Sequence, residues 1–168
     1  MVNQIADLLK KFNAIELGDF TLASGEKSSY YIDVKSSVTN PELLSTIVST
    51  IVQTQDFDVA AGVAIGGVPF AVATALISKK PYAIIRAAKK GHGKKDVIIG
   101  SVRGKNVLLI EDVTTSGGSA LYGVEVLREA GARINRVVTV VDREQGASEI
   151  LTRQGVVLIP LVRVSELL

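Results

Sequence analysis

The chain has 168 residues, 47% of them hydrophobic, and a formal net charge of +2 at pH 7. Its length and apolar content predict one folded domain with a substantial core and room for a small appended hood, and they exclude a disordered chain. Because there is no cysteine and His92 is the single histidine, disulfides, thiolate nucleophiles and zinc sites built from cysteine or several histidines are also excluded, so any metal must be a hard cation held by oxygens.

The N-terminal third predicts a helix, a hairpin and a second helix. Apolar residues recur on one face of Val2–Phe12, as expected for an amphipathic helix. Charged residues interrupt this apolar pattern, so we expect no signal peptide and a cytoplasmic protein. Short strands at Phe20–Leu22 and Tyr30–Val34 flank a turn at 23–26. The second helix is expected to begin near Asn40-Pro41, a capping residue followed by a proline suited to the first helical position.

The run from Val59 to Ser78 has no charged residue and is long enough to be considered as a membrane span. Glycines and Pro69 interrupt it, however. It is better explained as a buried strand at 59–64, a glycine turn, and a helix at 68–78 that carries Pro69 in its first turn. We therefore expect a soluble protein with no membrane partner.

The rest of the chain alternates strands with helices. The expected strands are Tyr82–Arg86, Val97–Val102, Val107–Ile110, Val137–Val141 and Val156–Leu161, and the expected helices are about 119–130 and Ala147–Arg153. This order predicts an α/β fold with a doubly wound parallel sheet flanked by helices. Ligands of such sheets bind beyond the carboxyl ends of the strands. The loops after Ala64, Arg86, Ile110 and Val141 are therefore expected to share one crevice.

The strongest chemical motif is the run VLLIEDVTTSGGS at 107–119. Two carboxylates, Glu111 and Asp112, follow a buried strand, and hydroxyl and glycine residues then lead into a helix N-terminus. Backbone N–H groups and hydroxyls in such a turn suit a phosphate monoester. The carboxylates would repel that phosphate, so we expect them to face sugar hydroxyls or a magnesium ion. Neither a Walker A motif nor a dinucleotide-binding glycine motif is present.

Three other segments are open to more than one interpretation. The basic run at 86–96 is either a solvated mobile loop or a lid whose cations bind a pyrophosphate. The turn at 66–69 either packs against its neighbours or binds pyrophosphate through backbone N–H groups. Tyr30 and Tyr31 either flank a flat ring or belong to a half-buried strand.

The run at 107–119 matches the 13-residue signature of type I phosphoribosyltransferases. The stretches 20–25, 28–35, 86–93 and 141–143 resemble the orotate branch of that family, and the resemblance extends from about residue 15 to 146. It implies a single domain over 1–168 with an N-terminal hood. It also implies transfer of ribose 5-phosphate from 5-phosphoribosyl 1-pyrophosphate to orotate in UMP biosynthesis. Mg²⁺ is expected as the cofactor, held mainly by the ligand rather than directly by the protein.

The resemblance also assigns roles to residues. Glu111 and Asp112 are expected to hold the ribose hydroxyls and, with Lys90 and His92, to be catalytic. The residues expected to bind phosphoribosyl pyrophosphate are Arg86, Lys89, Lys90, His92, Glu111, Asp112, Val113, Thr114, Thr115, Ser116, Gly117, Gly118 and Ser119. Those expected to bind orotate are Thr115, Arg143 and Tyr31. The family further implies a homodimer that shares the loop 86–96, with no nucleic-acid partner.

Four positions depart from the family pattern. Ala87 and Ala88 stand where lysine and glutamate are usual, Ala23 replaces a base-contacting lysine, and Gly66 stands where some bacterial members have lysine. Lys89 could compensate at the first position, and Lys27 or Lys35 at Ala23. Two alternatives therefore stay open: a phosphoribosyltransferase for another base such as a purine, and a non-catalytic regulator that senses phosphoribosyl pyrophosphate and binds nucleic acid. Against the regulator, the chain has no basic cluster outside 86–95.

Overall fold

The computed structural model describes residues 2–22, 25–87 and 97–168. Its elements in chain order are α1 (Val2–Lys11), β1 (Ile15–Thr21), β2 (Lys27–Ile32), α2 (Val34–Ser37), α3 (Pro41–Thr54), β3 (Val59–Val63), α4 (Val68–Ser78), β4 (Tyr82–Ile85), β5 (Ile98–Ile99), β6 (Val107–Thr114), α5 (Gly118–Glu129), β7 (Arg136–Asp142), α6 (Ala147–Arg153), β8 (Val157–Arg163) and the 3-10 turn η1 (Val164–Glu166).

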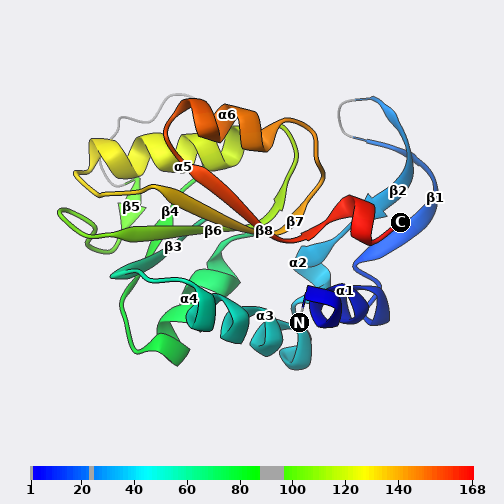
Figure 1. Ribbon diagram of the computed structural model, residues 1–168, viewed down its shortest axis with the longest axis horizontal. Coiled ribbons are helices and arrows are strands. Elements are labelled where there is room, and N and C mark those ends of the chain that lie inside the picture. Colours follow the sequence, from blue (N-terminus) through cyan, green and yellow to red (C-terminus); the bar gives the residue numbers. More distant parts are fainter. Residues whose placement is uncertain (1, 23–24, 88–96) are drawn as a thin grey trace.

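The main sheet has six strands in the order β5-β4-β3-β6-β7-β8. All neighbouring strands run parallel except β5, which pairs antiparallel with β4 at one edge. Figure 1 shows α3 and α4 on one face of this sheet and α5 and α6 on the other. The predicted doubly wound α/β fold is confirmed, with β5 as an antiparallel addition.

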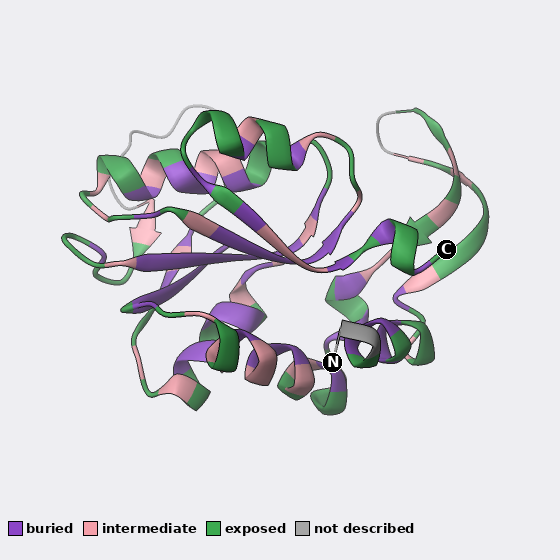
Figure 2. Cartoon of the chain, viewed as in Figure 1, coloured by how far each residue is buried: buried purple, intermediate pink, exposed green. Residues whose placement is uncertain are grey.

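Strand β6 shows how the sheet builds two cores. Leu108 and Ile110 are buried in the cluster that includes α1 and α3, whereas Val107 and Leu109 are buried in the cluster that includes α5 and α6. Alternate residues of a strand point to opposite faces, so a strand covered on both sides must be apolar throughout. Figure 2 shows the resulting pattern, with buried residues along the strands and exposed ones on the outer faces of the helices.

The hood consists of α1 and the antiparallel hairpin β1–β2, which projects from one end of the sheet in Figure 1. Both strands begin earlier than predicted, at Ile15 and Lys27, because polar residues of the hairpin pair through their backbones. The prediction that Val34 belongs to the second strand is wrong. Val34 instead begins α2, whose first turn is capped by the Asp33 carboxylate accepting the Ser36 N–H at 3.0 Å.

Among the other predicted strands, two boundaries move most. The expected strand Val97–Val102 shortens to Ile98–Ile99, since Gly100 takes a left-handed conformation with φ +108°. Strand β6, by contrast, continues to Thr114 because its backbone stays paired with β7 up to Asp142. The acidic pair therefore lies inside the strand rather than after it. Consecutive strand residues point to opposite faces, so the two side chains leave β6 on opposite sides, near the edge of the sheet where the strand ends.

The uncharged run that met the length test for a membrane span divides into β3 and α4, as predicted. Over the described ranges, no helix has both the length and the apolar character needed to cross a membrane.

Candidate active site

The turn between β6 and α5 lines a small open pocket of about 40 Å³. Its lining residues are Glu111, Val113, Thr114, Thr115, Gly117, Gly118, Ser119 and Ala120. Gly117 has φ +88°, a left-handed conformation that turns the chain from strand into helix. No described side chain caps the N-terminus of α5. A helix begins with unsatisfied N–H groups and a positive dipole end, so this pocket is suited to an anion such as a phosphate.

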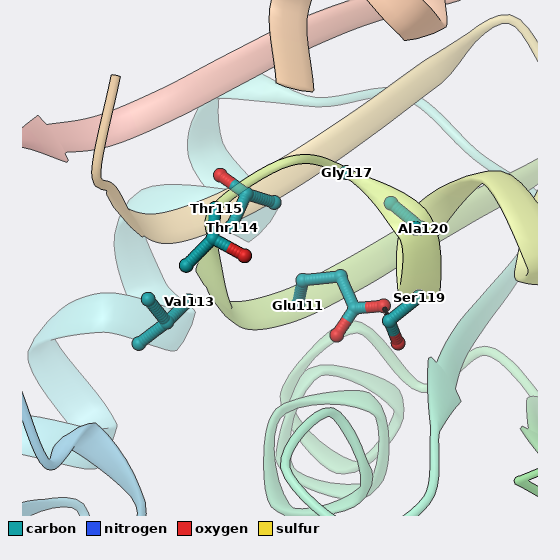
Figure 3. A pocket seen from close by; sticks show the side chains of 8 residues that line it. Glu111, Val113, Thr114, Thr115, Gly117, Ser119 and Ala120 are labelled. Carbon is teal, nitrogen blue, oxygen red and sulfur yellow. Dashed lines mark hydrogen bonds between the residues drawn. The ribbon is translucent and has the colours of Figure 1, made fainter. Parts of the chain in front are cut away.

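Glu111 lies on the α5 side of the sheet. Its carboxylate is buried and accepts a hydrogen bond from the Ser119 hydroxyl at 3.1 Å, and the two side chains face each other in Figure 3. Burial raises the pKa of Glu111 to about 7, with the Ser119 hydrogen bond opposing, Asp112 adding to the rise and Lys35 opposing it. This carboxyl group therefore changes its charge near neutral pH.

Asp112 lies on the opposite side, facing the hood. Its Oδ2 accepts a hydrogen bond from the Lys35 Nζ at 3.1 Å. Partial burial lowers the pKa of Lys35, but the charge of Asp112 and this hydrogen bond outweigh burial, so the pKa is raised. The carboxylate also rests on Gly66, where any Cβ would overlap it. Of the two lysines considered as substitutes at Ala23, Lys35 contacts Asp112, whereas Lys27 donates to Thr21 Oγ1 in the hairpin at 2.8 Å.

Arg143 follows β7 and reaches the hood. Its guanidinium carbon lies 5.0 Å from the ring centroid of Tyr30, and its Nε is buried without a hydrogen-bond partner among the described residues. Its backbone N–H donates to the Thr114 carbonyl at 2.9 Å, which fixes the start of its loop beside β6. A buried, unsatisfied guanidinium nitrogen beside an aromatic ring is well suited to a flat, negatively charged ligand.

The structure separates the two tyrosines of β2. Tyr30 is half-buried against Arg143, whereas Tyr31 is 47% exposed on the other face, with its ring centroid 5.7 Å from that of Phe20. The expectation that Tyr31 contacts a base stays a prediction, but the geometry favours its neighbour. Side chains alternate along a strand, so Tyr30 and Tyr31 cannot both contact a base that lies on one face of the hairpin.

The remaining predicted residues divide into three groups. Thr115, Ser116, Gly118 and Ser119 are exposed in the turn before α5 and its first residues. Arg86 is exposed at the end of β4, and its carbonyl accepts a hydrogen bond from the Tyr122 hydroxyl of α5 at 3.1 Å. Lys89, Lys90 and His92, together with Ala23 and Ala88, lie outside the described residues.

Asp142 is a candidate site residue that sequence analysis did not select, and Tyr30 is one whose role it left open. The Asp142 carboxylate is buried and accepts hydrogen bonds from the Thr114 hydroxyl at 3.0 Å and the Glu144 N–H at 3.2 Å. Asp142 therefore links the turn between β6 and α5 to the loop that carries Arg143. Two sequence signals pointed to Asp142: its place at the end of an otherwise apolar strand, and its place in the stretch 141–143 that resembles the orotate branch.

Within the described residues, no group of three or more His, Asp or Glu side chains could hold a metal ion. Glu111 and Asp112 are engaged with Ser119 and Lys35 respectively. The arrangement fits a hard cation that brings most of its oxygen ligands with it, as Mg²⁺ does when it accompanies phosphates.

Comparison with known proteins agrees with this geometry. The family model of the phosphoribosyl transferase domain matches residues 34–158. Orotate phosphoribosyltransferase from Methanocorpusculum labreanum is 62% identical over 168 residues, covering 100% of this chain and 99% of the relative. The crystal structure of orotate phosphoribosyltransferase from Aeropyrum pernix is similar with a TM-score of 0.87 and 33% identity, over 97% of this chain and 95% of that one.

A second solved structure carries a ligand. Orotate phosphoribosyltransferase from Mycobacterium tuberculosis, in complex with 5-phospho-α-D-ribosyl 1-diphosphate, is similar with a TM-score of 0.78 and 26% identity. The similarity covers 99% of this chain and 98% of that chain.

Proposed function

This chain belongs to the orotate phosphoribosyltransferase family, and from that premise we propose how its residues carry out the reaction. The enzyme is a pentosyltransferase of pyrimidine biosynthesis, which transfers ribose 5-phosphate from phosphoribosyl pyrophosphate to orotate and gives orotidine 5-phosphate and pyrophosphate. The observation that supports orotate best is Arg143, whose guanidinium lies against Tyr30 with a buried, unpartnered Nε. A guanidinium can hold the ring carboxylate of orotate through two parallel hydrogen bonds.

The three parts of the substrates are assigned to three parts of the site. The 5-phosphate binds the turn Thr114–Ser119 at the N-terminus of α5, where N–H groups and hydroxyls converge. The ribose hydroxyls face Glu111 and Asp112, the two carboxylates of β6. The orotate ring lies beside the Arg143 guanidinium, with Tyr30 and Thr115 at its edges.

The reaction requires no covalent intermediate with the protein. A ring nitrogen of orotate attacks the anomeric carbon, the bond to pyrophosphate breaks, and positive charge develops on the ribose ring. Carboxylates held beside that ring stabilise the developing charge, and the protein needs only to orient the two substrates and exclude water. Asp112 and the ionised form of Glu111 perform the electrostatic part.

We further propose that Mg²⁺ would accompany the pyrophosphate, would be held mainly by the ligand, and would offset part of the charge of the leaving group. Arg86, Lys89, Lys90 and His92 would add cations to the same group, and the loop 86–96 would be shared across a homodimer. The hood and the sheet act as one domain over residues 1–168, since Lys35 and Tyr30 of the hood side contact Asp112 and Arg143 of the sheet. A cytoplasmic location is part of the same proposal.

Turnover of a panel of bases tests the substrate. Wild-type protein with phosphoribosyl pyrophosphate and Mg²⁺ should release pyrophosphate with orotate and not with uracil, adenine or hypoxanthine. Turnover of a purine without orotate would contradict the base assignment and leave the family intact. Binding of phosphoribosyl pyrophosphate with no turnover of any base would instead support a regulatory protein.

A further inference from the structure

Lys35 belongs to α2, the short helix that connects the hood to α3, which packs on one face of the sheet. Hydrogen bonds hold both ends of this helix. Before its first residue, the Asp33 carboxylate accepts hydrogen bonds from the Ser36 N–H and hydroxyl. At its last residue, the Ser37 hydroxyl donates to the Phe12 carbonyl at 3.1 Å. The backbone of Lys35 is therefore held in place while its side chain extends toward β6. Its Nζ lies 3.1 Å from Asp112 Oδ2.

The Asp112 carboxylate is confined from two sides. On one side is the backbone of Gly66, which leaves no space even for a Cβ atom. On the other is Lys35, the one side chain in the described ranges that donates a hydrogen bond to this carboxylate. An aspartate side chain has two rotatable bonds, so removal of the lysine would let the carboxylate turn away from Gly66.

A second lysine of the same chain serves as a contrast. Lys11 pairs with Glu42 at 2.9 Å, and both side chains are more than half exposed, at 57% and 54%. Lys35 is equally exposed at 59%, but the side chain of its partner Asp112 is only 10% exposed. Ion pairs between two exposed groups contribute little, whereas a pair with one partner inside a site restricts the orientation of that partner.

We propose that Lys35 is a positioning residue of the ribose site, which holds the Asp112 carboxylate against Gly66 in the orientation that accepts hydrogen bonds from the ribose hydroxyls. This inference rests on the proposed function, since it takes the ligand to be phosphoribosyl pyrophosphate. Lys35 acts through Asp112 and makes no contact with the reacting atoms. It also adds a positive charge close to a site that must bind a polyanion.

The experiment compares Lys35→Met, Lys35→Arg and the matched control Lys11→Met. Calorimetry with phosphoribosyl pyrophosphate and Mg²⁺ gives the Kd without orotate, and steady-state kinetics give kcat and KM. Lys35→Met should weaken binding of phosphoribosyl pyrophosphate by about 10- to 100-fold, the scale of one charge-assisted hydrogen bond. Lys35→Arg should recover most of this loss, and KM for orotate should hardly change. Melting temperatures of all three variants should stay within about 4 °C of wild type.

The pH profile gives a readout that a purely structural role would not move. The groups shown to affect Glu111 are Asp112, Lys35 and the Ser119 hydroxyl, and of these the charge of Lys35 lowers the pKa of Glu111. Its removal should therefore move the acid limb of kcat/KM for phosphoribosyl pyrophosphate to higher pH, and Lys35→Arg should move it back. Lys11→Met should leave the limb in place.

Gly66→Ala disturbs the Asp112 carboxylate from the side opposite Lys35. The added Cβ must displace the Asp112 carboxylate, so this variant should also weaken phosphoribosyl pyrophosphate binding, and the double variant with Lys35→Met should lose less than the two single losses combined. Additive losses, or a Lys35→Met protein that matches Lys11→Met in Kd and pH profile, would overturn the proposal. Should wild-type protein turn over no orotate, the proposed function fails, whereas the calorimetric comparison still decides the role of Lys35.

Discussion

The hydroxyl of Thr114 donates a hydrogen bond of 3.0 Å to the buried carboxylate of Asp142, which pairs with it across β6 and β7. The same oxygen of Asp142 accepts the Glu144 N–H at 3.2 Å. Thr114 is the first residue of the proposed phosphate turn, and Arg143 lies between Asp142 and Glu144 in the chain. One buried aspartate therefore connects the proposed phosphate subsite with the proposed base subsite.

Asp142→Ala should lower both stability and activity. It leaves the buried Thr114 hydroxyl without its acceptor, which costs about 1–3 kcal/mol of unfolding free energy and lowers the melting temperature by roughly 2–12 °C in a chain of this size. Asp142→Asn retains one amide oxygen that can accept both hydrogen bonds, so it should cost much less. Thermal unfolding of the two variants, with kcat/KM for both substrates, measures the difference. Equal losses in Ala and Asn variants would mean that the charge of Asp142, and not its hydrogen bonds, matters.

Asp112→Asn tests the ribose assignment. The amide keeps the size of the side chain but removes the negative charge that stabilises the developing positive charge on the ribose. Turnover should fall about 10²-fold or more with the melting temperature almost unchanged. Steady-state kinetics and thermal unfolding of the same preparation separate the two effects. Kinetics close to wild type would remove Asp112 from the mechanism.

The pKa of Glu111 predicts a specific dependence of stability on pH. The folded protein raises this pKa from 4.5 to about 7, so it binds the proton more tightly than the unfolded chain does. The free energy of unfolding should therefore fall as pH rises through that interval, by up to about 3 kcal/mol for this one group. Denaturant unfolding of wild type and Glu111→Gln at pH 5 and pH 8 measures it. The Gln variant cannot titrate and should lack this decrease, while a parallel decrease in both proteins would assign it to other groups.

The order of strands and helices could be predicted from the sequence because each buried strand is a continuous apolar run bounded by glycine, proline or polar residues. The contacts between hood and sheet could not. Lys35 and Asp112 are 77 positions apart, and nothing in their spacing distinguishes Lys35 from Lys27 as the lysine that reaches the site. Alternation along β2 shows that Tyr30 and Tyr31 face opposite sides, but only the tertiary fold decides which side faces Arg143.

Mixed dimers test the shared loop 86–96. Lys90→Ala and Asp112→Asn should each inactivate a homodimer. If the loop acts on the site of the partner, a dimer with one chain of each kind has one site with both residues intact. Random mixing should then restore about a quarter of wild-type turnover, as expected for a symmetric dimer. A different affinity tag on each variant isolates the mixed dimers, and absence of any recovery in them would contradict a loop shared between subunits.

Variants of Arg143 test most directly whether the base is orotate. The carboxylate of orotate can accept two parallel hydrogen bonds from the guanidinium, and hydrogen bonds to charged groups contribute about 1.5–3 kcal/mol. Arg143→Ala should therefore lower kcat/KM for orotate by about 10- to 10³-fold, at a factor of ten per 1.4 kcal/mol. Arg143→Lys should recover part of this, since an ammonium retains the charge but not the planar fork. Calorimetric binding of phosphoribosyl pyrophosphate should hardly change in either variant.

Substitutions of Tyr30 and Tyr31 form a matched pair that tests the proposed base site. Tyr30 lies under the Arg143 guanidinium at 5.0 Å, whereas Tyr31 is 47% exposed on the opposite face of β2. A cation–π contact contributes about 0.5–2 kcal/mol, so Tyr30→Leu should lower kcat/KM for orotate by about 2- to 30-fold. Tyr31→Leu should have a smaller effect, because its ring does not contact the arginine. If Tyr31→Leu causes the greater loss, Tyr31 contacts the base, as sequence analysis expected, and the arginine holds Tyr30 for packing alone.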